Sequence, residues 1–319
     1  MERLSQLIET NCKAGRWEGV PVSKGGPQIS HLMSADDVVL FGEASKAQAI
    51  VAQASLNEFC EASGQKLNVQ KSSVYFSPNT NESTMAEICN TLAIQRTKDF
   101  GCYLGVLTMN GRMTKATFQD VITRLDKKLA GWKAKCLSLA GRTTLIQAAI
   151  NAIPAYSVQS TRIARSVCDE IDRKIRRFLW GGTNLERKTH LVAWDVVTRE
   201  TTDGGLGLRN MRQLNSAFLI KLGWRIETEP TALWARVLKA KYCKGHDLDN
   251  VVAGRYSCSN AWRGIMEALD LTRQGVGITM GDGRKIKFWS HRWIDGLKLQ
   301  EQVINTVPVE QINNRVYDY

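Results

Sequence analysis

The amino-acid sequence predicts an α+β fold, with strands and helices mixed in the first third and helices dominating the rest. Short β-prone runs flank turn signals before residue 111, whereas apolar residues recur at helical spacing from about residue 114 onward. Near the end, residues 275–293 alternate around Gly281-Asp282-Gly283, which predicts a terminal β-hairpin between Ile278 and residues 286–288.

A hairpin with an acidic tip is the most distinctive element of the first third. Residues 29–32 and 38–41 are β-prone and flank Met33-Ser34-Ala35-Asp36-Asp37, which places Asp36 and Asp37 at the tip. The other elements expected here are helices and strands set by periodicity and turn residues: helices over 2–13, 45–62 and 82–93, a strand over 74–76 and a strand pair over 100–107.

Beyond residue 114 the spacing of apolar residues predicts consecutive helices. They cover 118–129, 137–153, 167–180, 215–228 and 231–242. We expect Pro154 to end the second of these and Gly181-Gly182 to end the third, because proline and glycine interrupt helices. Most tryptophans lie at helical spacing among apolar neighbours, so we expect them to pack in the core and not to stack on bases.

Positive charge gathers in one part of the chain. The 319 residues carry a net charge of +12. Residues 1–111 hold 9 basic and 11 acidic residues, whereas residues 112–188 hold 16 basic and 6 acidic ones. A solvated helical surface is the ordinary explanation of such charge, but its concentration favours a polyanionic partner such as nucleic acid. No apolar run is long enough for a membrane span or a signal peptide, so we expect an intracellular, non-secreted protein without a membrane partner.

The eight cysteines and four histidines indicate little chemistry of their own. No Cys-x-x-Cys occurs, and we expect reduced, buried cysteines. Cys243, His246, Cys258 and His291 are the only set with partial zinc-like spacing, and the long gap before His291 makes zinc the less favoured alternative. No P-loop, dinucleotide-binding or serine-hydrolase motif is present, so no small-molecule cofactor is expected.

Asp36 and Asp37 can be read in two ways. Two adjacent carboxylates are usually a solvated turn. Where both stay ionised beside a polyanion, they can instead hold Mg²⁺, which prefers carboxylate and phosphate oxygens.

The residues around the acidic tip resemble a known family. His31-Leu32-Met33-Ser34-Ala35-Asp36-Asp37-Val38-Val39 is similar to the aromatic-Ala-Asp-Asp motif of reverse transcriptases, and most closely to the plant LINE-type non-LTR retrotransposon enzymes. These are RNA-directed DNA polymerases, a class of nucleotidyltransferase. The resemblance makes Asp36 the metal ligand, Asp37 its catalytic neighbour and Mg²⁺ the cofactor. Ser34 departs from the family, which has Phe or Tyr there.

Further motifs extend the resemblance over nearly the whole chain. Glu58 to Ser72 resembles the next palm motif, in which Lys71 is the candidate on the triphosphate side, although an exposed strand lysine explains Lys71 equally well. Tyr103-Leu104-Gly105 looks like the primer grip. The thumb resemblance starts at Leu129-Ala130-Gly131-Trp132. The basic candidates for nucleic-acid binding on the thumb-like helices are Lys127, Lys128, Lys133, Lys135, Arg142, Arg173, Lys174, Arg176 and Arg177.

The resemblance implies four parts and a fragmentary enzyme. The parts are a truncated palm (1–111), a basic helical thumb (112–182), a helical connection (183–245) and a C-terminal region (246–319) that stops before a zinc-binding segment. The first palm Asp and the fingers have no counterpart here, nor do an upstream endonuclease and a downstream ribonuclease H domain. We therefore expect a truncated reverse transcriptase that is catalytically incomplete by itself.

The implied partners are an RNA template and a DNA primer, and the implied location is the nucleus. Two alternatives stand beside this hypothesis. One is a non-catalytic nucleic-acid-binding remnant, and the other is a pseudogene product without function.

Overall fold

The structure is a computed structural model of the full chain, and it confirms the α+β class. It describes residues 1–104, 106–107, 114–131, 136–182, 188–246, 248, 258–275, 281–284, 286–291, 293–294, 297–304, 306–308 and 310–319. The described residues divide into two compact units. Unit 1 comprises residues 1–117 and 229–252, and unit 2 comprises residues 118–228 and 253–319. The four-part division expected from the sequence stays a prediction.

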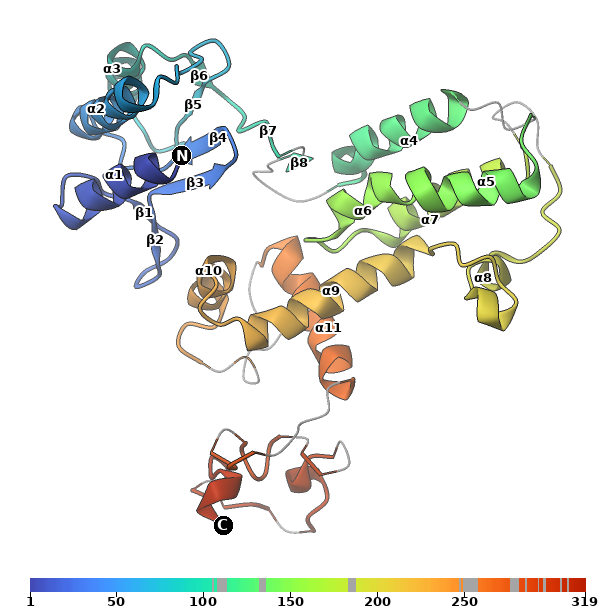
Figure 1. Cartoon of the computed structure of the whole chain (residues 1–319). Coiled ribbons are helices and arrows are strands. Elements are labelled where there is room, and N and C mark those ends of the chain that lie inside the picture. The colour runs from blue at the N-terminus through green and yellow to red at the C-terminus, as the bar shows by residue number, and fades with distance from the viewer. Residues whose placement is uncertain are drawn as a thin grey trace. The chain divides into compact units, whose positions relative to one another are not determined.

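Unit 1 contains short strand pairs and four helices among its described residues (Figure 1). The helices are α1 (Glu2–Lys13), α2 (Lys46–Ser63), α3 (Glu82–Leu92) and α10 (Leu233–Tyr242). The antiparallel pairs are β1 (Val20–Pro21) with β2 (Gln28–Ile29), β3 (His31–Ser34) with β4 (Asp37–Leu40), and β7 (Cys102–Tyr103) with β8 (Val106–Leu107). The parallel pair is β5 (Val74–Tyr75) with β6 (Arg96–Thr97), which α3 connects.

An apolar cluster anchors the β3–β4 hairpin in unit 1. Leu4 and Ile8 of α1 and Phe59 of α2 are buried against Trp17, and Met33 and other hairpin residues pack on them. The Trp17 indole N–H donates a hydrogen bond to the Phe41 carbonyl at 2.8 Å. The amphipathic face predicted for residues 2–13 therefore forms the support under the hairpin.

Unit 2 is helical in most of its described part (Figure 1). Its helices are α4 (Gln119–Gly131), α5 (Leu139–Leu145), α6 (Ala152–Val158), α7 (Arg165–Leu179), α8 (Trp194–Val197), α9 (Met211–Thr228) and α11 (Asn260–Gln274). α7 packs on α9, α5 and α4, and α9 packs along α11. The fully buried side chains include Ile122, Leu125, Ile146, Ile150, Ile171, Ile175, Leu179, Met211 and Ile226.

The helix predicted over 137–153 does not end at Pro154, so that prediction was wrong. α5 runs into a π-helical turn over Ile146–Ile150, and Pro154 is the third residue of α6. A proline in a first helical turn loses little, because the N–H groups there have no intrahelical acceptor. The π turn, in which the Asn151 N–H donates to the Ile146 carbonyl at 3.0 Å, separates the two α-helices just before the proline.

Helix α11 was not predicted from the sequence. Its signals are local and clear in retrospect, because the Ser259 hydroxyl accepts a hydrogen bond from the Trp262 N–H at 3.2 Å and caps the helix. Trp262, Ile265 and Leu269 then follow at helical spacing and are buried. Ile278, the expected partner in the terminal hairpin, lies outside the described residues, and Lys287 pairs with Arg315 in an antiparallel bridge.

The tryptophans divide between core and surface. Trp17, Trp194 and Trp262 are buried, as core packing predicts, whereas Trp224 is exposed.

In the described part of the chain, none of the helices combines the length and apolar character that a bilayer span requires.

Candidate nucleic-acid interface

The β3–β4 hairpin presents the two acidic residues at its tip, where the sequence placed them. Ser34 pairs with Asp37, so Ala35 and Asp36 form a two-residue turn, and Ala35 adopts a φ of 52°. Asp36 and Asp37 are both exposed. The base of the hairpin is fixed to α1, because His31 shares a 2.8 Å hydrogen bond between its Nε2 and the Ser5 hydroxyl. Burial is the main cause that lowers the pKa of His31.

The acidic tip does not by itself build a metal centre. In the described ranges, no three His, Cys, Asp or Glu side chains gather closely enough to hold an ion. Two exposed carboxylates fall short of the larger ligand set that a two-metal site uses. The described residues therefore do not fit the two-metal arrangement expected from the resemblance.

The other described candidates in unit 1 lie in turns or, for Tyr103, on a short strand. Lys71 is exposed in the turn before β5, where its backbone N–H donates to the Asn68 carbonyl at 3.1 Å. Tyr103 is half-buried on β7, and Leu104 follows in a turn with a φ of 51°. Gly105 lies outside the described residues. Their assigned roles stay predictions.

Exposed cations lie on two packed helices of unit 2. Lys127 and Lys128 are exposed on α4, and Arg173 is exposed on α7. Lys133 and Lys135 lie outside the described residues. α4 and α7 pack together, and we call the exposed sides of these two helices the α4–α7 surface.

The charge of Lys174 is paired with a carboxylate within the protein. Its Nζ lies 2.7 and 2.8 Å from the two carboxylate oxygens of Asp126 on α4. The pair joins α7 to α4 across 48 residues of sequence, and no local pattern could have revealed it. Lys174 therefore holds the two helices in register and leaves the outward positions to Lys127 and Arg173.

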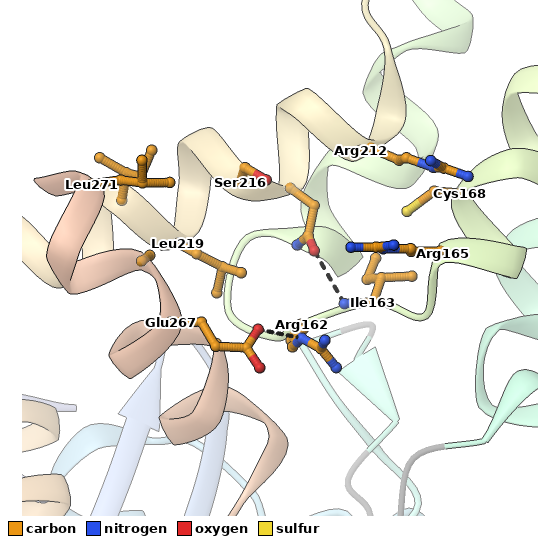
Figure 2. Close-up of a pocket in the computed structure, with 13 residues that line it drawn as sticks. Arg162, Ile163, Arg165, Cys168, Arg212, Ser216, Leu219, Glu267 and Leu271 are labelled. Atoms are coloured by element: carbon orange, nitrogen blue, oxygen red, sulfur yellow. Dashed lines mark hydrogen bonds and ion pairs between the residues drawn. The ribbon is translucent and has the colours of Figure 1, made fainter. Parts of the chain in front are cut away.

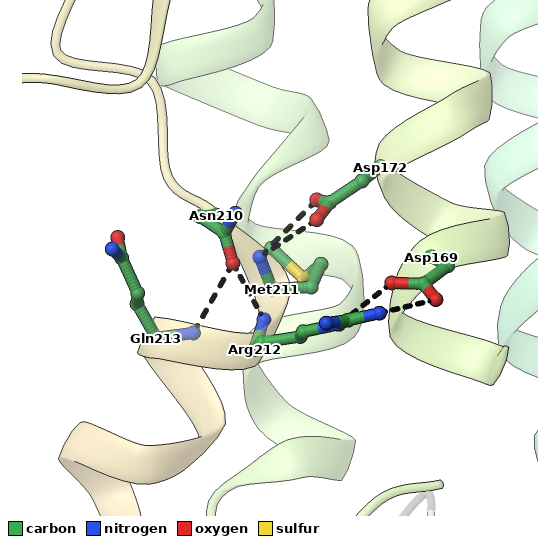
Figure 3. Close-up of polar contacts among 6 residues, drawn as sticks. All are labelled: Asp169, Asp172, Asn210, Met211, Arg212 and Gln213. Carbon is green, nitrogen blue, oxygen red and sulfur yellow. Dashed lines mark hydrogen bonds and ion pairs between the residues drawn. The ribbon is translucent and has the colours of Figure 1, made fainter. Parts of the chain in front are cut away.

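An acidic pair on α7 receives the start of α9 (Figure 3). The Asn210 side-chain oxygen caps α9 by accepting from the Arg212 and Gln213 N–H groups at 3.0 and 3.2 Å. Arg212 forms a two-pronged ion pair with Asp169, at 2.7 and 2.5 Å. This hydrogen bond is the first cause that lowers the pKa of Asp169.

Asp172 lies one helical turn further along α7 and is buried. Its Oδ1 accepts from the Met211 N–H at 3.1 Å. Burial raises the pKa of Asp172 to about 6, and the Met211 hydrogen bond offsets only part of that rise. The carboxylate is thus a buried acceptor for the first turn of α9.

A pocket of about 440 Å³ opens between α7, α9 and α11 (Figure 2). Arg162 lies on its lower edge, where its guanidinium pairs with Glu267 at 2.6 Å. Arg165 and Arg212 lie at the other end, and Leu219 and Leu271 supply apolar lining. The pocket is therefore amphipathic, with its cations at the ends.

Asn215 shapes the pocket wall from α9. Its buried amide donates to the Val158 and Thr161 carbonyls at 2.9 and 2.8 Å and accepts from the Ile163 N–H at 3.1 Å. Cys168 also lines the pocket, and burial is the first cause that raises the pKa of its thiol to about 11. A thiol protonated at neutral pH is a poor nucleophile, so Cys168 serves packing.

The remaining candidates gather where α7 ends. Arg142 of α5 lies against Gly181, which follows α7 with a φ of 72°. Arg176 lies on the last turn of α7, and the His190 ring stacks on Trp180 with centroids 6.4 Å apart. Arg177 shares this last turn. The sequence pointed to the arginines, whereas it favoured core packing for Trp180 and a structural role for His190.

Comparison with known proteins yields two plant relatives, and no family model matches the chain. A putative ribonuclease H protein, At1g65750 of Arabidopsis thaliana, is 38% identical over 192 residues, which is 60% of this chain and 31% of that protein. The uncharacterized mitochondrial protein AtMg00310 of the same plant is 32% identical over 144 residues, which is 45% of this chain and 93% of that protein. The chain belongs to the AtMg00310 family.

This family membership corrects the identification suggested by the sequence motifs. The relatives are named as a ribonuclease H protein and as an uncharacterized mitochondrial protein, and neither is named a reverse transcriptase. The identification as a plant LINE-type reverse transcriptase was therefore wrong. Its central motif was a short acidic hairpin, which here lacks the family's aromatic residue at Ser34 and a third nearby metal-binding group among the described residues. The AtMg00310-family chain spans about a third of the length of the ribonuclease H protein.

Proposed function

We propose that this chain is a nucleic-acid-binding segment of a plant protein of retrotransposon origin, and that unit 2 binds an RNA or RNA–DNA duplex without performing chemistry. A relative named as a putative ribonuclease H protein supports the retrotransposon origin, because a ribonuclease H domain was the neighbour expected downstream in such elements. The chain corresponds to a part of that larger protein, so the ribonuclease activity in its name is not assigned to this chain.

The concentration of charge is the observation that carries the proposal. Residues 112–188 hold 16 basic and 6 acidic residues, and the described part of this segment folds into the helices from α4 to α7. The Lys174–Asp126 pair fixes α4 against α7, so Lys127 and Arg173 are presented on a common support. A rigid basic surface releases condensed counterions when it binds phosphates, which drives association with any duplex.

The acidic hairpin is the observation that favours binding without chemistry in this proposal. Asp36 and Asp37 are exposed, and within the described ranges no third metal-binding side chain joins them. A nucleic-acid-binding segment needs no such centre, because phosphate contacts alone supply sequence-independent affinity.

A salt titration tests this function. Fluorescence anisotropy of a labelled RNA duplex and of an RNA–DNA duplex should show binding to the full chain at low salt. Contacts with about 4 to 6 phosphates should give log K a slope of about −4 to −5 against log salt concentration. A labelled neutral peptide-nucleic-acid duplex, which lacks phosphates, is the matched control and should not bind. Salt-independent binding, or no binding at low salt, would overturn the proposal.

A further inference from the structure

Four side chains from three segments converge at the C-terminal end of α7. Arg142 comes from α5, and its Nη1 occupies the space that a Cβ on Gly181 would need. Arg176 and Trp180 are four residues apart, and such residues are neighbours on a helix surface. The His190 ring stacks on Trp180 at an interplanar angle of 25°. We call these four residues the α7-end cluster.

Three nitrogen atoms of the α7-end cluster are buried without an acceptor among the described residues. They are Arg142 Nε, Arg176 Nε and Trp180 Nε1. Buried N–H groups in proteins almost always have a partner, so this group of orphaned donors calls for an acceptor that the described residues do not supply. All three nitrogen atoms are donors only, so an acceptor-only ligand suits them.

Positive charge is concentrated at the same place. The pKa of His190 is lowered first by burial and then by the positive charges of Arg176 and Arg177. Elsewhere in unit 2 cations face carboxylates, as in the Lys174–Asp126, Arg212–Asp169 and Arg273–Glu227 pairs. None of the ion pairs between described residues involves Arg142 or Arg176.

The unpaired carbonyl groups at the C-terminal end of α7 do not by themselves explain why these arginines gather there. A helix C-terminus attracts cations through its unpaired carbonyl groups. Here the chain's own N–H groups cap them: Trp180 donates to the Arg176 carbonyl at 3.2 Å, Gly181 to that of Phe178 at 3.0 Å, and Gly182 to that of Arg177 at 2.9 Å. The carbonyl groups are thus partly satisfied before any arginine approaches them.

We propose that the α7-end cluster binds a phosphate group of the nucleic-acid backbone, with Arg142 and Arg176 donating to its oxygens and His190 and Trp180 forming the adjacent wall. This inference rests on the proposed function and adds a specific anchoring point to it. Arginine forks match phosphate geometry and bind it with two parallel hydrogen bonds, which makes arginine the residue suited to this site.

The first test uses inorganic phosphate with the full chain. The ring resonances of His190, assigned by comparison with His190→Gln, should shift in a saturable manner as phosphate is added to about 20 mM, a range that would saturate a site with a dissociation constant of about 1 mM. Arg142→Gln/Arg176→Gln should lose this shift. Arg263→Gln is the matched control, because it removes the same charge from an exposed position on α11 and should retain the shift. A wild-type His190 that does not respond would overturn the proposal without reference to any variant.

The second test uses the RNA duplex and separates this inference from the proposed function. Arg176→Gln should weaken duplex binding about tenfold and lower the salt slope by about one, whereas Arg263→Gln should stay within about threefold. If the wild type binds duplex and both variants bind alike, the α7-end cluster is not an anchoring point although the proposed function stands. If inorganic phosphate shifts His190 but no duplex binds, the site stands and the proposed function fails. Arg176→Lys guards against misfolding, because it keeps the charge but not the fork and should lose part of the affinity.

Discussion

Asp172 shows how one buried carboxylate couples the α7–α9 junction to pH. Its pKa is raised from an ordinary value of 3.8 to about 6, mainly by burial. Between these two values the folded chain binds more protons than the unfolded chain, so the free energy of unfolding falls as pH rises from about 4 to 6. The stabilisation is complete below pH 4, and a shift of this size corresponds to a change of about 1–3 kcal/mol between pH 4 and pH 7.

We expect Asp172→Asn to remove this pH dependence. The amide oxygen can still accept from the Met211 N–H, but no charge is buried, so the variant should be more stable than the wild type at pH 7.5 and equally stable near pH 4. Urea denaturation at several pH values measures this difference.

Asp169→Asn is the control, because it should change the free energy of unfolding at pH 7.5 in the opposite direction to Asp172→Asn. Arg212 lowers the pKa of Asp169, so its contribution is present at neutral pH and is lost as pH falls through the lowered value. Asp169→Asn should therefore destabilise the chain at pH 7.5. Equal responses of the two variants would contradict the assignment of burial to Asp172 and of ion pairing to Asp169.

Single residues were predictable only where local sequence determined their place. The hairpin put Asp36 and Asp37 at its tip, as β-prone flanks and a short turn required. The partners of the basic residues were not predictable, because Asp126 meets Lys174 and Asp169 meets Arg212 over more than 40 residues of sequence. Packing between segments distant in sequence decides which basic side chains pair with a carboxylate. Counting charges along the chain cannot reveal these pairs.

Elements were more predictable than residues, because helical periodicity is a local property. The helices over 2–13 and 82–93 appear within a residue of their expected bounds. The prediction that Pro154 ends a helix was wrong because the effect of a proline depends on its position within a helical turn, which the sequence leaves open. Each described sheet is a pair of strands of two to four residues. Strands this short are too brief to show a clear alternation of apolar and polar residues in the sequence.

The α9–α11 contact depends on two glycines. A Cβ on Gly223 of α9 would lie 2.7 Å from the Thr272 hydroxyl oxygen, and one on Gly264 of α11 would lie 2.8 Å from Leu219 Cδ2. Thr272 is buried and donates to carbonyls of both helices, so it cannot move aside easily. The two helices thus approach closely because glycine leaves room on each.

Gly223→Ala should accordingly destabilise unit 2. The overlap with Thr272 costs about 1–3 kcal/mol, which outweighs the gain of up to about 1 kcal/mol in helix propensity. Thermal unfolding should show the melting temperature falling by about 2–4 °C for each kcal/mol lost.

Gly141→Ala is the matched control on α5. The nearest atom to its Cβ would be the Ser138 hydroxyl oxygen at an ordinary 3.5 Å, so only the propensity term remains and the variant should gain about 0.5–1 kcal/mol. A gain of stability at both positions would show that α9 and α11 do not pack as closely as described.

At the scale of the whole molecule, positive charge is distributed unevenly along the chain. The net charge of +12 alone indicates only a polyanionic partner. Its division assigns 11 acidic and 9 basic residues to positions 1–111, which hold the acidic hairpin, and the basic excess to positions 112–188. The charge distribution therefore predicts binding through residues 112–188, and this stays a prediction, whereas the family suggested by the hairpin motif was wrong.

This division leads to a comparison of two double variants in the duplex-binding assay. Asp36→Asn/Asp37→Asn changes two exposed charges at the hairpin tip in unit 1, and we expect duplex affinity to stay within about threefold, because the proposal assigns duplex binding to unit 2. Lys127→Gln/Arg173→Gln changes two exposed charges on the α4–α7 surface, and there we expect at least a tenfold loss and a salt slope smaller by about two. Repeating both titrations with Mg²⁺ distinguishes a further case: if Mg²⁺ strengthens binding of the wild type but not of Asp36→Asn/Asp37→Asn, the hairpin carboxylates hold the ion against the duplex. That outcome would place part of the binding site in unit 1, and equal losses from the two double variants would refute the assignment of binding to unit 2.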